Sequence, residues 1–310
     1  MKKHWYLIII LLLFSALLLL IAFGQTVGEG VRAGMRLAYR NVLPALFPAA
    51  ILCGMLGELL EHLPLRPTAA LWLTAQLCGF PLGIKTTVRA YRRGLIDREQ
   101  ALRLSRCAVN ASPAFLISYL GGTVLDNTKA GLLLYGAQTG ISFLLALHYE
   151  AFTESPPLLP QSRPFPLLLT ESIGHAADGC LLLTAFITAF SAVASLCREL
   201  PYFSYWYGGL ELTGGIPALP PEPIWFYGLW VGFTGISVLL QNTTVLLSAE
   251  LSPLPMLQSR LLYTAALPLA MIRPKLMMTL FIFILFLISF DKRRKKSYNR
   301  LNVKRERRIL

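Results

Sequence analysis

Charged residues are scarce in this sequence, and the residue patterns of common catalytic centres are missing from it. Only 15% of its 310 residues are Asp, Glu, Lys or Arg, whereas soluble domains carry about 25%. The four histidines are not at the spacing of metal ligands. No G-x-S-x-G, H-E-x-x-H or Walker sequence occurs. These shortages argue against a soluble domain and against an enzyme, and they predict neither a metal site nor a cofactor.

Cysteine is also sparse, and its positions do not suggest cross-links. The number is odd, no C-x-x-C pair occurs, and most of the cysteines lie in apolar runs. We interpret them as small buried hydrophobic residues, since neither a disulfide framework nor a zinc site is supported. The five are Cys53, Cys78, Cys107, Cys180 and Cys197.

Long apolar runs make up most of the chain, of which 55% is hydrophobic. Several runs are long enough to cross a bilayer as helices, so the sequence predicts an all-α polytopic membrane protein with about six full spans. The first run could instead be a signal peptide, but its length and the lack of an A-x-A site favour a retained span. The expected apolar runs are residues 5–23, 43–60, 69–84, 114–125, 131–148, 179–197, 224–247 and 261–290, of which 69–84 is taken as re-entrant and 224–247 carries the second of the two breaks described below.

Positive charge gathers in two places and accounts for most of the net charge of +13. One is the segment 85–106, in which Asp97 is a predicted helix N-cap. The other is the tail 291–310. Beside membrane spans, such clusters mark the cytoplasmic side and contact anionic lipid. Both segments are therefore predicted to be cytoplasmic, and nucleic acid is not expected as a partner.

Two apolar stretches contain glycine in a pattern that an unbroken helix does not tolerate. The first is Gly79-Phe80-Pro81-Leu82-Gly83-Ile84-Lys85, and the second runs from Gly232 to Ser237. Proline lacks a backbone donor and glycine disfavours helical order. Broken segments at matching places of two halves are typical of transporter binding sites. We therefore predict two re-entrant hairpins, with Gly83 and Gly235 bordering one cavity near the bilayer midplane.

The order of lead-in helix, span, broken segment and return helix occurs twice along the chain. This order predicts two inverted repeats, with the stretch 209–215 as an inserted loop in the second. The predicted parts are an N-terminal span (1–24), a first repeat (25–148), a proline-rich linker (149–170), a second repeat (171–290) and the basic tail (291–310).

Polar residues beside the breaks are the candidate substrate-binding residues, because polar groups inside a membrane are costly and are functional by default. Lys85 would neutralise an anion, or else reach to the membrane interface. Asn110 and Ser112 would bind substrate, cap a helix, or do both. Glu211 is either a site residue or a solvated loop carboxylate. We expect Lys85, Asn110 and Gln241 to line one polar cavity.

The full candidate set is defined by the breaks and the polar residues next to them. It comprises Gly79, Pro81, Gly83, Lys85, Asn110, Ser112, Glu211, Thr213, Gly232, Gly235, Ser237, Gln241 and Asn242. Two further amides in apolar runs, Gln76 and Gln138, are expected to be contacts between packed helices.

Several of these stretches together resemble a known family. G-F-P-x-G-x-K begins at Gly79, N-x-S-P-x-F begins at Asn110, and a basic segment lies between them. G-L-x-E-x-T-x-G begins at Gly209, one residue shorter here, and G-x-x-G-x-S-V-x-x-Q begins at Gly232. In this order, over residues 30–270, they resemble the sporulation integral membrane protein family of endospore-forming bacteria. That family belongs to the nucleoside-recognition or Gate-domain group, which is similar to concentrative nucleoside transporters.

The resemblance implies an inverted-repeat fold with two re-entrant hairpins in the bacterial cell membrane or the outer forespore membrane. It implies transport of a small anion such as dipicolinic acid during sporulation. Positive charge beside the first break favours an anionic substrate, whereas the amides and hydroxyls would suit a nucleoside. A spore-envelope scaffold without transport is the remaining alternative, and a homo-oligomer is compatible with each of these functions.

Overall fold

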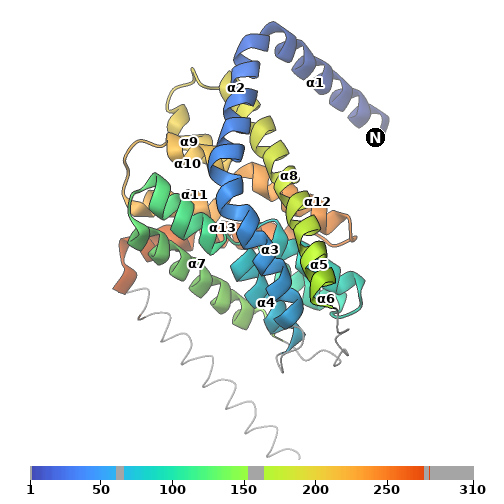
Figure 1. Ribbon diagram of the computed structural model, residues 1–310. Coiled ribbons are helices and arrows are strands. Elements are labelled where there is room, and N and C mark those ends of the chain that lie inside the picture. Colours follow the sequence, from blue (N-terminus) through green and yellow to red (C-terminus); the bar gives the residue numbers. More distant parts are fainter. Residues whose placement is uncertain (1, 61–65, 153–163, 276–278, 280–310) are drawn as a thin grey trace, which may run out of the picture.

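The computed structural model describes residues 2–60, 66–152, 164–275 and 279, and these residues form helices joined by short connections (Figure 1). No strand occurs among them. Helix α1 (Lys2–Ala22) projects away from the other helices, which pack together into one body (Figure 1). The predicted all-α class is confirmed.

Four helical stretches in the described residues are long and apolar enough to cross a membrane. They are Gly24–Leu60, Thr128–His148, Phe165–Leu196 and Ile224–Leu247. They indicate an integral membrane protein. Of the other predicted runs, 5–23 lies almost wholly in α1, 114–125 is a shorter apolar helix, and 261–290 is described only as far as 275 and at 279. The total of six spans stays a prediction, and the basic tail lies outside the described residues.

The two longest helical stretches lie side by side through the molecule (Figure 1). One joins α2 (Gly24–Leu37), the π-helix η1 (Ala38–Val42) and α3 (Leu43–Leu60) without a break, and the other is α8 (Phe165–Leu196). Each predicted lead-in helix thus continues directly into the following span. The pair is antiparallel, because Gly30 lies against Ser195 at one end and Gly54 lies against Ser172 at the other. Small residues at these contacts allow the two backbones to approach closely.

A methyl group at Gly34 is expected to loosen this helix pair. A Cβ there would lie 2.8 Å from the Cα of Thr188, which is backbone and does not move aside easily. We expect Gly34→Ala to destabilise the protein by about 1–3 kcal/mol through overpacking, measured as a lower thermal unfolding midpoint in detergent. The control is Gly28→Ala on the same helix, where a Cβ meets only the Arg32 side chain at 3.7 Å. Equal midpoints for both variants would contradict the close helix contact.

The remaining helices follow the same order in each half of the chain. In the first half they are α4 (Pro67–Cys78), α5 (Leu82–Arg92), α6 (Arg98–Ser105), the π-helix η2 (Ala114–Val124) and α7 (Thr128–His148). In the second half they are α9 (Phe203–Leu210), α10 (Leu212–Ala218), α11 (Ile224–Phe233), α12 (Gly235–Leu247) and α13 (Leu254–Ile272). Each half therefore has a long helix, two pairs of helices separated by breaks, and a closing helix.

The two breaks of the first half contact each other. Helix α4 ends at Cys78, the next residue, Gly79, has φ of +68°, and α5 begins after Pro81. The Phe80 backbone N–H donates to the carbonyl oxygen of Asn110 at 2.8 Å. Since Asn110 lies between α6 and η2, this bond joins the first break to the second. The predicted interruption of the helix at the glycine-proline stretch is thus confirmed.

The second half has the same arrangement, although part of it differs from the sequence prediction. The stretch 209–215 was expected as a loop, but it holds the end of α9 and most of α10, with Glu211 between the two helices. The other break falls at Thr234, with φ of +71°, inside the predicted stretch 232–237. A Cβ on Gly235 would lie 3.1 Å from the Leu212 nitrogen, so these two breaks are also in contact.

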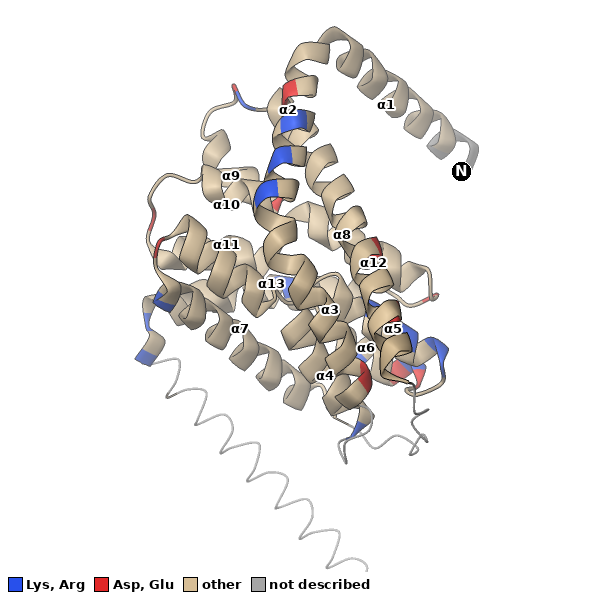
Figure 2. Cartoon of the chain, viewed as in Figure 1, with Lys and Arg blue, Asp and Glu red and all other residues tan. Residues whose placement is uncertain are grey.

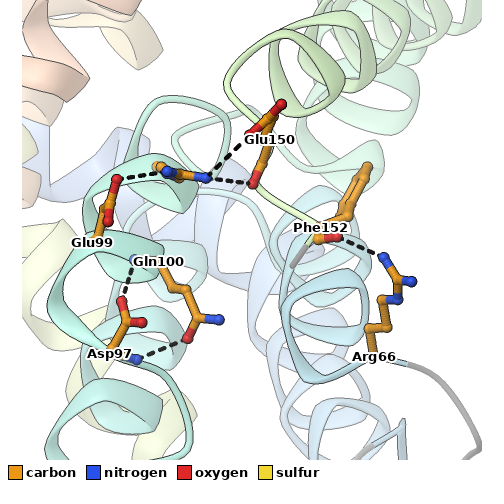
Figure 3. Close-up of polar contacts among 7 residues, drawn as sticks. Arg66, Asp97, Glu99, Gln100, Glu150 and Phe152 are labelled. Atoms are coloured by element: carbon orange, nitrogen blue, oxygen red, sulfur yellow. Dashed lines mark hydrogen bonds and ion pairs between the residues drawn. The ribbon is translucent and has the colours of Figure 1, made fainter. Parts of the chain in front are cut away.

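Charged residues gather along α2 and around α5 and α6, whereas the rest of the body carries few (Figure 2). Asp97 and Gln100 form a capping box at the start of α6, which confirms the predicted N-cap (Figure 3). From the same helix, Arg103 donates to Glu99 Oε1 at 2.5 Å and to the Glu150 carbonyl oxygen at 3.1 Å. The bond to Glu150 attaches the basic segment 85–106 to the residues that follow α7.

Candidate functional site

Two adjoining cavities lie beside the first break. The larger, here called the charged cavity, has a volume of about 120 Å³ and lies between α3, α4, α5 and α8. The smaller, the inner cavity, has a volume of about 40 Å³. Ala50, Cys78, Leu82 and Ala176 line both of them. The two cavities are therefore neighbours along the same helices.

The charged cavity combines acidic and basic side chains. Arg89 Nη1 lies 3.3 Å from Glu58 Oε1. Burial lowers the pKa of Lys85, while the nearby Asp178 carboxylate acts to raise it. The charged or titratable residues that line the charged cavity are Glu58, Lys85, Arg89, Arg93, Glu171, His175 and Asp178. Lys85 is thus a half-buried cation at this cavity, which three acidic side chains line as well.

The inner cavity brings together predicted site residues from both halves of the chain. Pro81 and Ser112 come from the breaks of the first half, and Thr213 comes from the start of α10 in the second. Gly79 adjoins them, because a Cβ on it would lie 2.5 Å from the Ser112 nitrogen. The halves are also joined here by Tyr119, whose hydroxyl donates to the Thr213 carbonyl oxygen at 3.0 Å.

Side-chain amides replace the missing helical hydrogen bonds between α6 and η2. Gln138 donates to the carbonyl oxygen of Ala111 at 2.9 Å and accepts from its N–H at 3.0 Å. Gln76 and Asn110 both donate to the Cys107 carbonyl oxygen, at 3.1 and 2.9 Å. Gln76 and Gln138 were predicted as packing contacts; the bonds show that they hold the broken backbone between 107 and 113. Buried backbone groups need such partners.

Glu211 is a helix cap inside the protein and not a solvated loop residue. Its carboxylate is 1% exposed and accepts from the backbone N–H groups of Thr213 and Gly214. Burial raises the pKa of Glu211, and these two backbone hydrogen bonds act to lower it. The carboxylate therefore fixes the start of α10 and with it the position of Thr213.

The other predicted residues of the second half make their contacts within that half. A Cβ on Gly232 would collide with the Tyr263 carbonyl oxygen, so this glycine allows α11 to approach α13. Asn242 donates to the Val238 carbonyl oxygen at 2.7 Å, and Gln241 lies 3.5 Å from the hydroxyl of Ser237. The side-chain oxygens of Gln241 and Asn242 have no hydrogen-bond partner among the described residues.

Neither the charged cavity nor the inner cavity is the one that Lys85, Asn110 and Gln241 were predicted to share. Lys85 lines the charged cavity, whereas Asn110 and Gln241 line neither cavity. Gly83 and Gly235 also line neither. Each of the two packs against its own half, Gly83 against Ala108 and Gly235 against Gly208. A common cavity for these residues stays a prediction.

Sequence reasoning missed Arg260, which lies in the middle of α13 and is 1% exposed. Its Nη2 donates to the Asn110 side-chain oxygen at 3.4 Å. A signal for it was present, because an arginine within an apolar run is itself a reason to suspect a functional site. The run 261–290 was taken to begin one residue later, so Arg260 was left out.

Comparison of the chain with known protein families, with curated proteins and with solved structures finds no match. The fold therefore shows only the class of protein, which is an α-helical integral membrane protein whose two halves have similarly ordered helices.

Proposed function

We propose that this protein transports a small anionic solute across a membrane. The inner cavity carries the proposal, because broken segments of both halves meet there at Pro81, Ser112 and Thr213. Transporters built from two repeats place their substrate between the repeats, where unwound backbone supplies polar groups. The matching order of elements in the two halves supports the inverted-repeat interpretation.

The adjoining charged cavity supports an anion as the substrate. Lys85 lines it, and Ala50, Cys78, Leu82 and Ala176 connect its walls to those of the inner cavity. An anion drawn to Lys85 would thus lie next to the meeting point of the breaks. Volumes of about 120 and 40 Å³ are smaller than the roughly 300–1,000 Å³ of typical ligand sites. The protein is therefore closed here, and transport requires a more open conformation.

Dipicolinic acid is the substrate that the family resemblance suggests, and a location in the cell membrane or forespore membrane follows from the same resemblance. A nucleoside is the second candidate, favoured by the hydroxyls of Ser112 and Thr213 at the inner cavity. A scaffold without transport is the third.

Uptake into liposomes containing the purified protein tests these three functions. We expect saturable uptake of labelled dipicolinate above that of protein-free vesicles, and no saturable uptake of labelled uridine. Uptake of uridine alone would assign a nucleoside transporter. Uptake of neither compound would favour the scaffold.

The place of the pathway is tested with single cysteines in a variant whose five native cysteines are replaced. Thiol labelling of Thr213→Cys should block uptake, because this residue lines the inner cavity. Labelling of Thr123→Cys should not, because Thr123 is exposed at the end of η2. Inhibition by the label at both positions, or at neither, would contradict a pathway through the inner cavity.

A further inference from the structure

The guanidinium of Arg260 is buried without enough hydrogen-bond acceptors around it. Its one hydrogen bond to the described part of the chain, from Nη2 to Asn110 Oδ1, is long at 3.4 Å. The Nε and Nη1 atoms have no partner among the described residues. The guanidinium carbon lies 3.6 Å from the ring centroid of Tyr263, so one face of the group is covered by an aromatic ring.

No carboxylate neutralises this charge within the described part of the chain. The ion pairs found there are Arg89 with Glu58 and Arg103 with Glu99 and Glu150. Arginine stays protonated in proteins, and an isolated buried charge costs several kcal/mol. A cation in this position therefore requires an anion that the described chain does not provide.

The groups around Arg260 supply donors in excess of acceptors. The Cys107 carbonyl oxygen already accepts from Gln76, Asn110 and Ser142. Asn110 also donates to Gln76 Oε1 at 2.8 Å. The Tyr263 hydroxyl lies near Ser142 and Asn110, and among the described residues no partner is placed at hydrogen-bonding geometry for it. A small anion would supply the acceptors that this cluster lacks.

We propose that Arg260 binds a carboxylate group of the transported solute, with the Tyr263 hydroxyl as a second donor. This inference rests on the proposed transport function. A carboxylate fits because its two oxygens match the planar guanidinium in paired hydrogen bonds. Asn110 would then orient the guanidinium from the break between α6 and η2.

Access to Arg260 requires movement of the protein. The residue lines neither the charged nor the inner cavity, and α13 is packed against α11 and α7. A solute reaches the guanidinium only if α13 separates from the segment 107–113. The arrangement described here is accordingly the closed one.

Binding to the purified protein in detergent tests the assignment. We would measure equilibrium binding of pyridine-2,6-dicarboxylate and succinate, with pyridine-2,6-dicarboxamide and inorganic phosphate as comparison compounds. At least one dicarboxylate should bind to the parent protein, and the neutral diamide should not. Arg260→Gln should weaken dicarboxylate binding more than tenfold, and Arg260→Lys should weaken it less. The matched control is Arg98→Gln, an exposed arginine of α6, which should bind as the parent does.

The unfolding midpoint without ligand separates binding from a structural role. Arg260→Gln should be at least as stable as the parent, because it removes an unpaired buried charge. A less stable Arg260→Gln variant would overturn the proposal, since the guanidinium would then already have its partner inside the protein. Unchanged binding in Arg260→Gln, binding of phosphate alone, or binding of no carboxylate by the parent would also overturn it. Carboxylate binding that depends on Arg260 but comes without uptake in liposomes would contradict the transport function and leave the binding site standing.

Discussion

Replacing Lys85 by alanine is expected to lower the uptake of an anionic solute about ten- to a hundredfold. That range corresponds to the loss of one charge-assisted hydrogen bond, about 1.5–3 kcal/mol. Lys85 is the basic residue at the start of α5, one turn from Leu82, which lines both cavities. Its removal also leaves the nearby Asp178 carboxylate to repel an approaching anion.

The measurement is initial uptake rate against solute concentration in liposomes that contain equal amounts of each variant. Lys85→Arg should retain most of the activity, because it keeps the positive charge. Arg93 lines the same cavity and is therefore a poor control, whereas the exposed Arg98 lines neither cavity. Uptake that is normal in Lys85→Ala, or equally reduced in Arg98→Ala, would show that Lys85 is not on the path of the solute.

Replacing Gly79 by alanine is expected to have the largest effect on stability. Gly79 has φ of +68° and ψ of −173°, a region that is nearly closed to other residues and costs them about 1–3 kcal/mol. A Cβ there would also lie 2.5 Å from the nitrogen of Ser112, which adds about 1–3 kcal/mol of overpacking. Since these two residues adjoin the inner cavity, uptake should be lost together with stability.

Gly94→Ala separates the two contributions. Gly94 has φ of +72°, but a Cβ on it would meet nothing within 4 Å. Its variant should therefore show only the backbone strain, as a smaller fall in the thermal unfolding midpoint, and should keep its uptake activity. A midpoint for Gly79→Ala no lower than that of Gly94→Ala would mean that the two breaks of the first half are not in close contact.

Local features of the fold could be predicted from the sequence because their causes are local. The break after α4 follows from Gly79 and Pro81, and the start of α6 follows from Asp97 and Gln100. The same reliance on local pattern gave a wrong prediction for the stretch 209–215, which contains several glycines. It suggested a loop, whereas the buried carboxylate of Glu211 caps a helix there by accepting from Thr213 and Gly214.

The contacts between distant parts of the chain could not be predicted in this way. The break at Phe80 is bonded to Asn110, and the break at Thr234 lies against the one at Glu211. The sequence suggested a cavity bordered by Gly83 and Gly235, and it did not indicate that the two breaks within one half contact each other. Nothing in the residues near a glycine indicates which other break it will meet, because that depends on how whole helices pack.

Because α2 and α3 pack closely against α8, substitutions in one half of the chain constrain substitutions in the other. Gly34 lies against the backbone of Thr188 and the small side chain of Ser191. A lineage that gains volume at position 34 must lose it at 191 and let the two backbones move apart, and the same holds for Gly30 and Ser195. Substitutions on the two helices should therefore occur as compensating pairs. An alignment of homologous chains would then show these positions covarying although more than a hundred residues separate them.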